Sequence, residues 1–143
     1  MNKKGFTLIE LLVVIGIIVI LAAIVLVAVN PGRQLSTARD AQRSSDINTI
    51  LNAVNQYMVD NNGQLPGVVP DCASGVQAIG SGGVDLSSDL VATYVAQMPN
   101  DPGSSSADAG TAVDTGYEIC ASSNRVTVSA PNTELGSVKS VTR

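Results

Sequence analysis

The carboxylate of Glu10 lies in a stretch of apolar residues, where a charge needs a partner. The residues from Leu11 to Val29 carry no charge, and the next basic side chain is Arg33. On insertion scales, a carboxylate within such a helix costs about 2.5–3.5 kcal/mol. Cleavage after Gly5 would create a positive α-amino group on Phe6, one helical turn from Glu10. That amine could pair with Glu10 of the same chain or of a neighbouring chain.

The rest of the composition argues against catalysis and against nucleic-acid binding. The chain has no histidine, so it lacks the commonest general base and the commonest zinc ligand. No nucleophile–base pair and no paired-carboxylate arrangement stands out. The 8 basic and 12 acidic side chains give a net charge of −4, and an acidic surface does not neutralise phosphates. We therefore predict that the chain is not an enzyme and does not bind nucleic acid directly.

The uncharged run from Leu11 to Val29 is long enough to cross a membrane. Its 19 residues, at about 1.5 Å each, nearly match a hydrocarbon core of about 30 Å. The run has no polar face, which the core helix of a soluble domain would show. Lys3 and Lys4 precede it, so we expect the N-terminus in the cytoplasm and the rest outside. A secretory signal would have a shorter apolar stretch and a small-residue cleavage site.

The segment Lys4–Glu10 has the sequence Lys-Gly-Phe-Thr-Leu-Ile-Glu, and an aliphatic run follows at once. It resembles the class III signal of type IV pilins and type II secretion pseudopilins. The resemblance implies that a prepilin peptidase cuts between Gly5 and Phe6 and N-methylates Phe6. It also implies that Glu10 pairs with the Phe6 amine of an adjacent subunit during assembly. The plainer alternative is a signal anchor with a chance glutamate near the membrane edge.

The same resemblance implies a location and a set of partners. The subunit is expected to wait in the cytoplasmic membrane as a single-pass protein with its head outside. A membrane assembly platform and a cytoplasmic ATPase would then build many copies into a helical filament, extracellular or periplasmic. The passages Asp60–Pro66 and Pro99–Pro102 are similar to those of major pseudopilins, whereas a disulfide favours a pilin. An anchored extracellular binding module that does not polymerise is the alternative from another class.

We divide the chain into a leader (1–5), a transmembrane and polymerisation helix (6–29), the amphipathic second half of this long helix (30–62), and a globular head (63–143). Asn30-Pro31-Gly32 should interrupt the helix, because proline lacks a donor and glycine is a weak helix former. Beyond it, one helical face gathers Ile47, Ile50, Leu51, Val54, Tyr57 and Met58. Arg39, Asp40, Arg43 and Asp46 are predicted to form a solvated mixed-charge surface, or else a contact between subunits.

The head is predicted to hold a small sheet. Residues 117–121 and 125–129 have strand patterns joined by a hairpin loop, and 138–142 adds a third strand. A short helix is expected within 86–98. The apolar face of such a sheet needs cover, which the amphipathic helix supplies. The predicted fold class is therefore α+β, a long N-terminal hydrophobic and amphipathic helix packed on a small antiparallel head, as in pilins.

Two further features of the head concern its cysteines and its acidic loop. Cys72 and Cys120 lie in the part predicted outside, so they should form one disulfide. Asp101, Asp108 and Asp114 crowd one loop, and carboxylates are calcium ligands. Since major pseudopilins bind calcium in the corresponding loop, the resemblance implies a calcium site here; no other cofactor is expected. The spacing is not that of an EF-hand, and the alternative is a solvated acidic loop.

Overall fold

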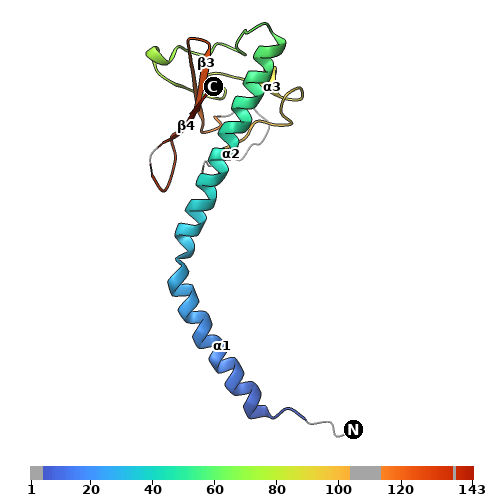
Figure 1. Ribbon diagram of the computed structural model, residues 1–143, viewed down its shortest axis with the longest axis vertical. Coiled ribbons are helices and arrows are strands. Elements are labelled where there is room, and N and C mark those ends of the chain that lie inside the picture. Colours follow the sequence, from blue (N-terminus) through green and yellow to red (C-terminus); the bar gives the residue numbers. More distant parts are fainter. Residues whose placement is uncertain (1–4, 104–113, 137) are drawn as a thin grey trace. The chain divides into compact units, whose positions relative to one another are not determined.

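The computed structural model of the chain describes residues 5–103, 114–136 and 138–143. Its elements, in order, are the helices α1 (Leu8–Val29) and α2 (Pro31–Asp60), the 3₁₀ turn η1 (Cys72–Ser74), strand β1 (Gln77–Ala78), helix α3 (Ser87–Leu90), and strands β2 (Glu118–Ser122), β3 (Arg125–Ala130) and β4 (Lys139–Thr142) (Figure 1). The chain divides after Leu35 into two compact units. We call the second of them, Ser36–Arg143, the head unit.

Apart from Glu10 in its first turn, helix α1 is apolar on all sides. Thr7 caps its first turn, and Asn30, with a left-handed φ of 43°, ends it. Among the described residues, α1 is the one helix whose length and composition would allow it to cross a membrane. No residue of α1 is buried, so its whole apolar surface is available to lipid or to other helices.

The predicted interruption of the long helix is confirmed. Asn30 leaves the helical conformation, and Pro31 opens α2, a position where its missing N–H is not needed. The Asn30 side-chain oxygen accepts a hydrogen bond of 3.3 Å from the amide of Arg33, which caps the new helix. At the other end of α2, Asn62 and Gly63 adopt positive φ, as their residue types predict.

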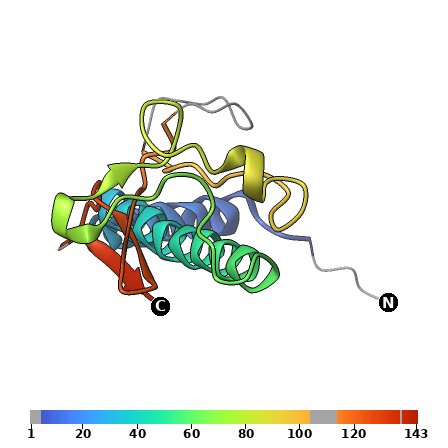
Figure 2. The ribbon, with the colours of Figure 1, turned by 90° about the horizontal axis from the view of Figure 1, so that it is seen from above.

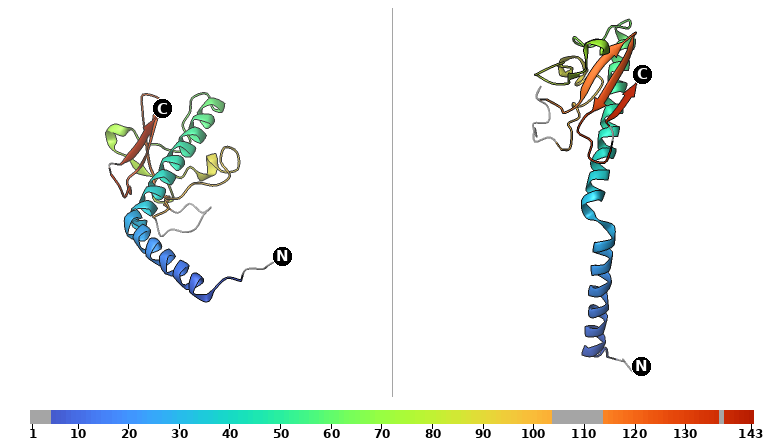
Figure 3. Two further views of the ribbon diagram at one scale, coloured as in Figure 1. Left: turned by 60° about the horizontal axis from the view of Figure 1, so that its bottom comes forward. Right: turned by 90° about the vertical axis from the view of Figure 1, so that its left-hand side faces the viewer.

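The core of the head unit lies between α2 and the sheet. Ile47, Ile50, Leu51, Val54 and Met58 are buried, as the helical periodicity predicts, while Tyr57 is half-buried and packs at the margin. The sheet contributes Ile119, Val126 and Val128. The strands run alongside α2 (Figure 3), so the predicted α+β arrangement, with α2 covering an antiparallel sheet, is confirmed.

Within residues 5–103, 114–136 and 138–143, the sheet has four strands rather than the three predicted. Their order is β1-β2-β3-β4, and every neighbouring pair is antiparallel. The hairpin between β2 and β3 turns on Ser123 and Asn124, both with positive φ, as in the tight turns that match strand twist. Strand β1 pairs only two residues, Gln77 with Ile119 and Ala78 with Glu118. A strand this short has no alternation to detect in the sequence.

The prediction of a helix within residues 86–98 is mostly wrong. Only Ser87–Leu90 is helical, because Ala92 has a φ of 71° and its amide donates to the carbonyl of Val95. This turn lets Leu86 and Leu90 reach the core, so tertiary packing overrides helix propensity here. In Figures 1 and 2, α3 and β4 lie toward opposite sides of α2.

Candidate functional site

The peptide bond between Gly5 and Phe6 lies before the first turn of α1. Gly5, Phe6 and Thr7 are exposed and outside any helix, and Phe6 is 78% exposed. Thr7 has the extended backbone of an N-cap residue. An exposed, non-helical bond is what a peptidase needs to reach, because a helical backbone is already engaged in hydrogen bonds.

Glu10 is held by Thr7 in a capping box that the sequence analysis missed. The amide of Thr7 donates to Glu10 Oε2 at 3.0 Å, and the Thr7 hydroxyl donates to the same oxygen at 2.7 Å. The amide of Glu10 donates in return to the Thr7 hydroxyl at 3.3 Å. The Thr-x-x-Glu spacing is the signal that could have revealed it. These bonds fix the carboxylate near the start of α1 but do not neutralise its charge.

An apolar hollow borders this carboxylate. Phe6, Ile9, Val13 and Val14 line it together with Glu10, and its volume is about 360 Å³. The hollow lies on an otherwise unpartnered helix surface. Its size and its apolar lining suit the side chains of another helix, which would bring any amine on that helix close to Glu10.

The comparisons with known proteins point to this same segment. Residues 1–26 match the family model described as the prokaryotic N-terminal methylation motif. The chain carries an N-terminal methylation motif. It is also similar to the type IV wide pilus major component PilA4 of Thermus thermophilus, with 43% identity over 61 residues. That match covers 43% of this chain and 45% of the relative, so it spans less than half the length of the curated protein. The resemblance of the N-terminal segment to type IV pilins is therefore confirmed. No solved structure matches the chain.

The other predicted site residues lie in the head unit. Cys72 and Cys120 form the predicted disulfide, with their Cα atoms 4.9 Å apart. This bond ties η1 to strand β2, so it links the segment before the sheet to one of its strands.

Arg43 is the centre of a buried ion-pair cluster that the sequence analysis also missed. It is 1% exposed, although it was expected on a solvated or intersubunit surface. Its guanidinium donates to Asp101 at 2.8 Å, to Asp40 at 2.7 Å and to Glu134 at 3.3 Å. Glu134 also pairs with Arg39 at 3.2 Å. The cluster joins α2 to two connecting segments that lie far from it in the sequence.

Hydrogen bonds keep the carboxylates of this cluster ionised. A bond from the Glu134 amide lowers the pKa of Asp40, and one from the Ser36 hydroxyl lowers the pKa of Glu134. Burial alone would raise the pKa of Asp101, but hydrogen bonds from Arg43 and from a backbone amide outweigh it, so that this pKa is also lowered. The bond to Asp101 in turn raises the pKa of Arg43. All four groups are therefore charged at neutral pH.

Two glycines let the backbone approach this cluster closely. A Cβ atom on Gly103 would lie 2.7 Å from Arg43 Nη2, and one on Gly116 would lie 2.7 Å from Asp101 Cβ. Gly116 also has a φ of 79°, which other residues rarely adopt. The backbone at Gly103 and at Gly116 is thus packed directly on the Arg43–Asp101 pair.

The three acids predicted to bind calcium have different surroundings. Asp101 is buried, and Arg43 donates to both of its carboxylate oxygens. Asp108 lies outside the described residues. Asp114 is exposed and accepts a hydrogen bond from the Gly116 amide. Calcium binding stays a prediction, but a guanidinium already serves as the cation for Asp101, which leaves that carboxylate little capacity for a metal.

Proposed function

We propose that this chain is a structural subunit of a type IV pilus-like filament, a pilin or pseudopilin, and has no catalytic role. Helix α1 anchors it in the cytoplasmic membrane with the head unit outside, and later forms the filament core. At about 33 Å for 22 residues, α1 is long enough for the first task. Its full exposure suits the second, because helices buried in a filament need no polar face.

One observation carries the proposal most directly. Within a matched methylation motif, an exposed Gly5–Phe6 bond lies immediately before a capped helix whose first turn holds the charged Glu10. Cleavage of that bond by a prepilin peptidase gives Phe6 a positive amine, which the same enzyme methylates. Glu10 of a neighbouring subunit then supplies the counter-charge in an apolar medium, where an unpaired carboxylate is costly.

The remaining partners follow from this role. A membrane assembly platform, driven by a cytoplasmic ATPase, would draw subunits from the bilayer into the growing filament. The Phe6–Glu10 pairing would set the axial register between neighbours. The similarity to a type IV wide pilus component supports this class of assembly over an anchored binding module that remains monomeric.

Mass spectrometry of the mature N-terminus is the first test. A chain that begins at N-methylated Phe6 supports the proposal, whereas a mature chain that retains Lys3 and Lys4 contradicts it. Gly5→Val provides the matched control, because it should block cleavage while leaving α1 and the head unit unchanged. The uncleaved variant should accumulate in the membrane and form no filaments.

Two substitutions of Glu10 separate its charge from its capping role. Glu10→Gln removes the charge but keeps an acceptor for Thr7, since glutamine also completes a capping box. Glu10→Leu removes both. If pairing with the Phe6 amine drives assembly, both variants insert into the membrane and neither forms filaments. Filaments from Glu10→Gln alone would assign the effect to capping, and normal filaments from both would refute the pairing.

A further inference from the structure

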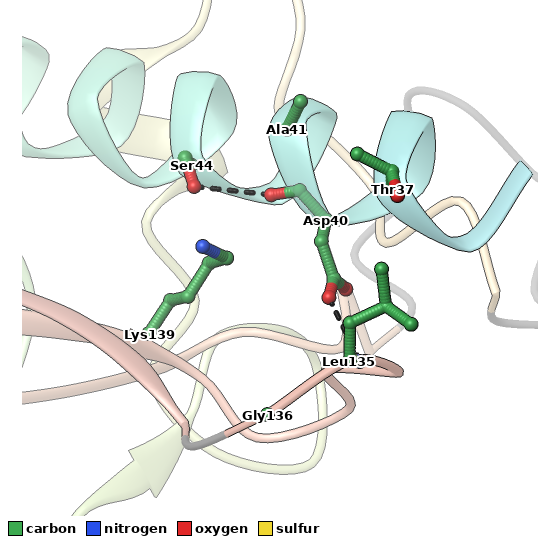
Figure 4. Close-up of a pocket in the computed structure, with 7 residues that line it drawn as sticks. All are labelled: Thr37, Asp40, Ala41, Ser44, Leu135, Gly136 and Lys139. Atoms are coloured by element: carbon green, nitrogen blue, oxygen red, sulfur yellow. Dashed lines mark hydrogen bonds between the residues drawn. The ribbon is translucent and has the colours of Figure 1, made fainter. Parts of the chain in front are cut away.

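A groove of about 610 Å³ with a mixed polar and apolar lining lies in the head unit, between the first half of α2 and the segment that leads into β4. Its lining residues are Thr37, Asp40, Ala41, Ser44, Leu135, Gly136 and Lys139 (Figure 4). The volume is within the range of sites that bury a ligand group. The groove is separate from the Phe6–Glu10 site, which lies in the other unit.

Lys139 is the cation of this groove. It is half-buried at the start of β4, and Figure 4 shows its ammonium reaching toward α2. Among the described residues it forms no ion pair. Lysine is rarely withdrawn from water without a partner, so the position calls for an anion from outside the chain.

The one carboxylate that lines the groove is already engaged. Asp40 accepts hydrogen bonds of 3.0 Å from the amides of Glu134 and Leu135, and it pairs with Arg43 at 2.7 Å. Both of its carboxylate oxygens thus have donors, and it forms no ion pair with Lys139. Lys139 therefore has no counter-ion among the described residues of the groove, and one negative group from outside the chain would supply it.

A second copy of this chain can supply that group. The sequence has 12 acidic against 8 basic side chains, and Arg39 and Arg43 are already paired within the head unit. Four exposed acids take part in no ion pair within the described residues, namely Asp60, Asp71, Asp85 and Asp114. Each copy thus carries surplus carboxylates, and opposite charges on different faces of identical chains favour their association.

The lining of the groove includes one large apolar side chain that is exposed. Leu135, which lines the groove on the segment between β3 and β4, is 47% exposed. A contact between copies would cover this side chain while it neutralises Lys139. An apolar side chain beside one charge is the composition expected of a specific protein contact, whereas a small free anion would leave that side chain in water.

We propose that this groove receives an acidic side chain of a neighbouring copy in the filament, with Lys139 as its counter-ion. In this contact the groove of one copy meets a different surface of the next copy. Such a heterologous contact can repeat into an open helical assembly. This inference rests on the proposed function, since only an assembly of copies brings such a surface to the groove.

The test compares filament yield for full-length variants that carry the same charge change at two positions. Lys139→Glu should lower the yield about tenfold, because like charges then meet in a partly desolvated site. Lys139→Arg should assemble as the original chain does. Arg125→Glu is the matched control, because Arg125 is exposed and forms no ion pair within the described residues. Normal filaments from Lys139→Glu would overturn the inference.

A second measurement does not depend on the folding of that variant. A photo-crosslinking amino acid at Leu135 in an otherwise original chain should capture a peptide from another copy that contains one of the four surplus acids. Reversing that acid to lysine should restore filaments to Lys139→Glu. Capture of a different protein, or of no copy at all, would refute the inference. If instead the original chain forms no filaments, it is the proposed function that fails.

Discussion

At the scale of single residues, Arg43 shows how a charge can be buried at little cost. Its guanidinium has five N–H donors in a fixed plane, and the structure gives them carboxylates on three sides, from Asp40, Asp101 and Glu134. Each of these acids receives further hydrogen bonds from backbone amides or hydroxyls. All three guanidinium nitrogens of Arg43 therefore donate to a carboxylate, and hydrogen bonding of this kind is what makes a buried ion pair tolerable.

Removing one partner from this cluster should be far more damaging than removing a surface charge. Arg43→Met should lower the free energy of unfolding by about 3–5 kcal/mol, because Asp101 stays buried without its cation. Arg39→Met is the matched control, and it should cost less than about 1 kcal/mol, since the Arg39 side chain is 44% exposed and its ion pair is screened by water. Urea unfolding in detergent, followed by near-ultraviolet circular dichroism of the tyrosines, measures both. Equal losses of unfolding free energy in the two variants would contradict the expected cost of leaving Asp101 buried without its cation.

The same cluster predicts how stability depends on pH. The pKa values of Asp40, Asp101 and Glu134 are lower in the folded head unit than their ordinary values, so the unfolded chain takes up protons first as the pH falls. This stability is complete at neutral pH and is lost below about pH 4.

In Arg43→Met the pKa of Asp101 should rise, and the acid-induced loss of stability should become less steep. Unfolding midpoints measured across this pH range would test this expectation. Slopes identical to those of the original chain would show that the acid transition has another origin.

At the scale of elements, prediction from sequence worked where a pattern repeats and failed where contacts decide. The buried face of α2 and strands β2 and β3 follow from periodicity, and the helix break follows from Asn30 and Pro31. The two-residue strand β1 and the short α3 depend on packing against distant residues. The burial of Arg43 could not be predicted either, because its partner Asp101 lies 58 residues away.

The candidate site shows the same limits as the fold. The methylation motif and the disulfide were predictable, since the first is a contiguous pattern and the second needs only two cysteines in a part of the chain predicted to lie outside the membrane. The capping box of Thr7 and Glu10 was also within reach of sequence reasoning. The groove around Lys139 was not, because α2 and the segment before β4 become neighbours only in the folded head unit.

Removal of the disulfide should lower the stability of the head unit. Replacing Cys72 and Cys120 by serine together should lower the free energy of unfolding by up to about 4 kcal/mol, since the bond closes a long loop in the unfolded chain. The sheet and the Arg43 cluster should survive, because neither depends on the sulfurs. Far- and near-ultraviolet spectra of the variant check this, with the reduced original chain as control. An unchanged midpoint would show that the bond contributes no stability.

At the scale of the whole molecule, the two units differ in what they bury. Every residue of the hydrophobic core lies in the head unit, from Ile47 onward, whereas α1 buries none of its residues. Folding energy is therefore concentrated in one unit, and the other keeps its apolar surface for its environment. Under the proposed function, such a division would let the chain pass from a bilayer to a filament without refolding its head unit.

This division predicts that a fragment starting at Ser36 folds by itself. The fragment keeps the core, the disulfide and the Arg43 cluster, so it should be soluble without detergent and monomeric in analytical ultracentrifugation. Its melting temperature should match that of the full chain in detergent within a few degrees, since α1 contributes no buried area. The full chain without detergent should aggregate through α1. A fragment that melts without cooperativity would show that residues 1–35 are needed to complete the fold.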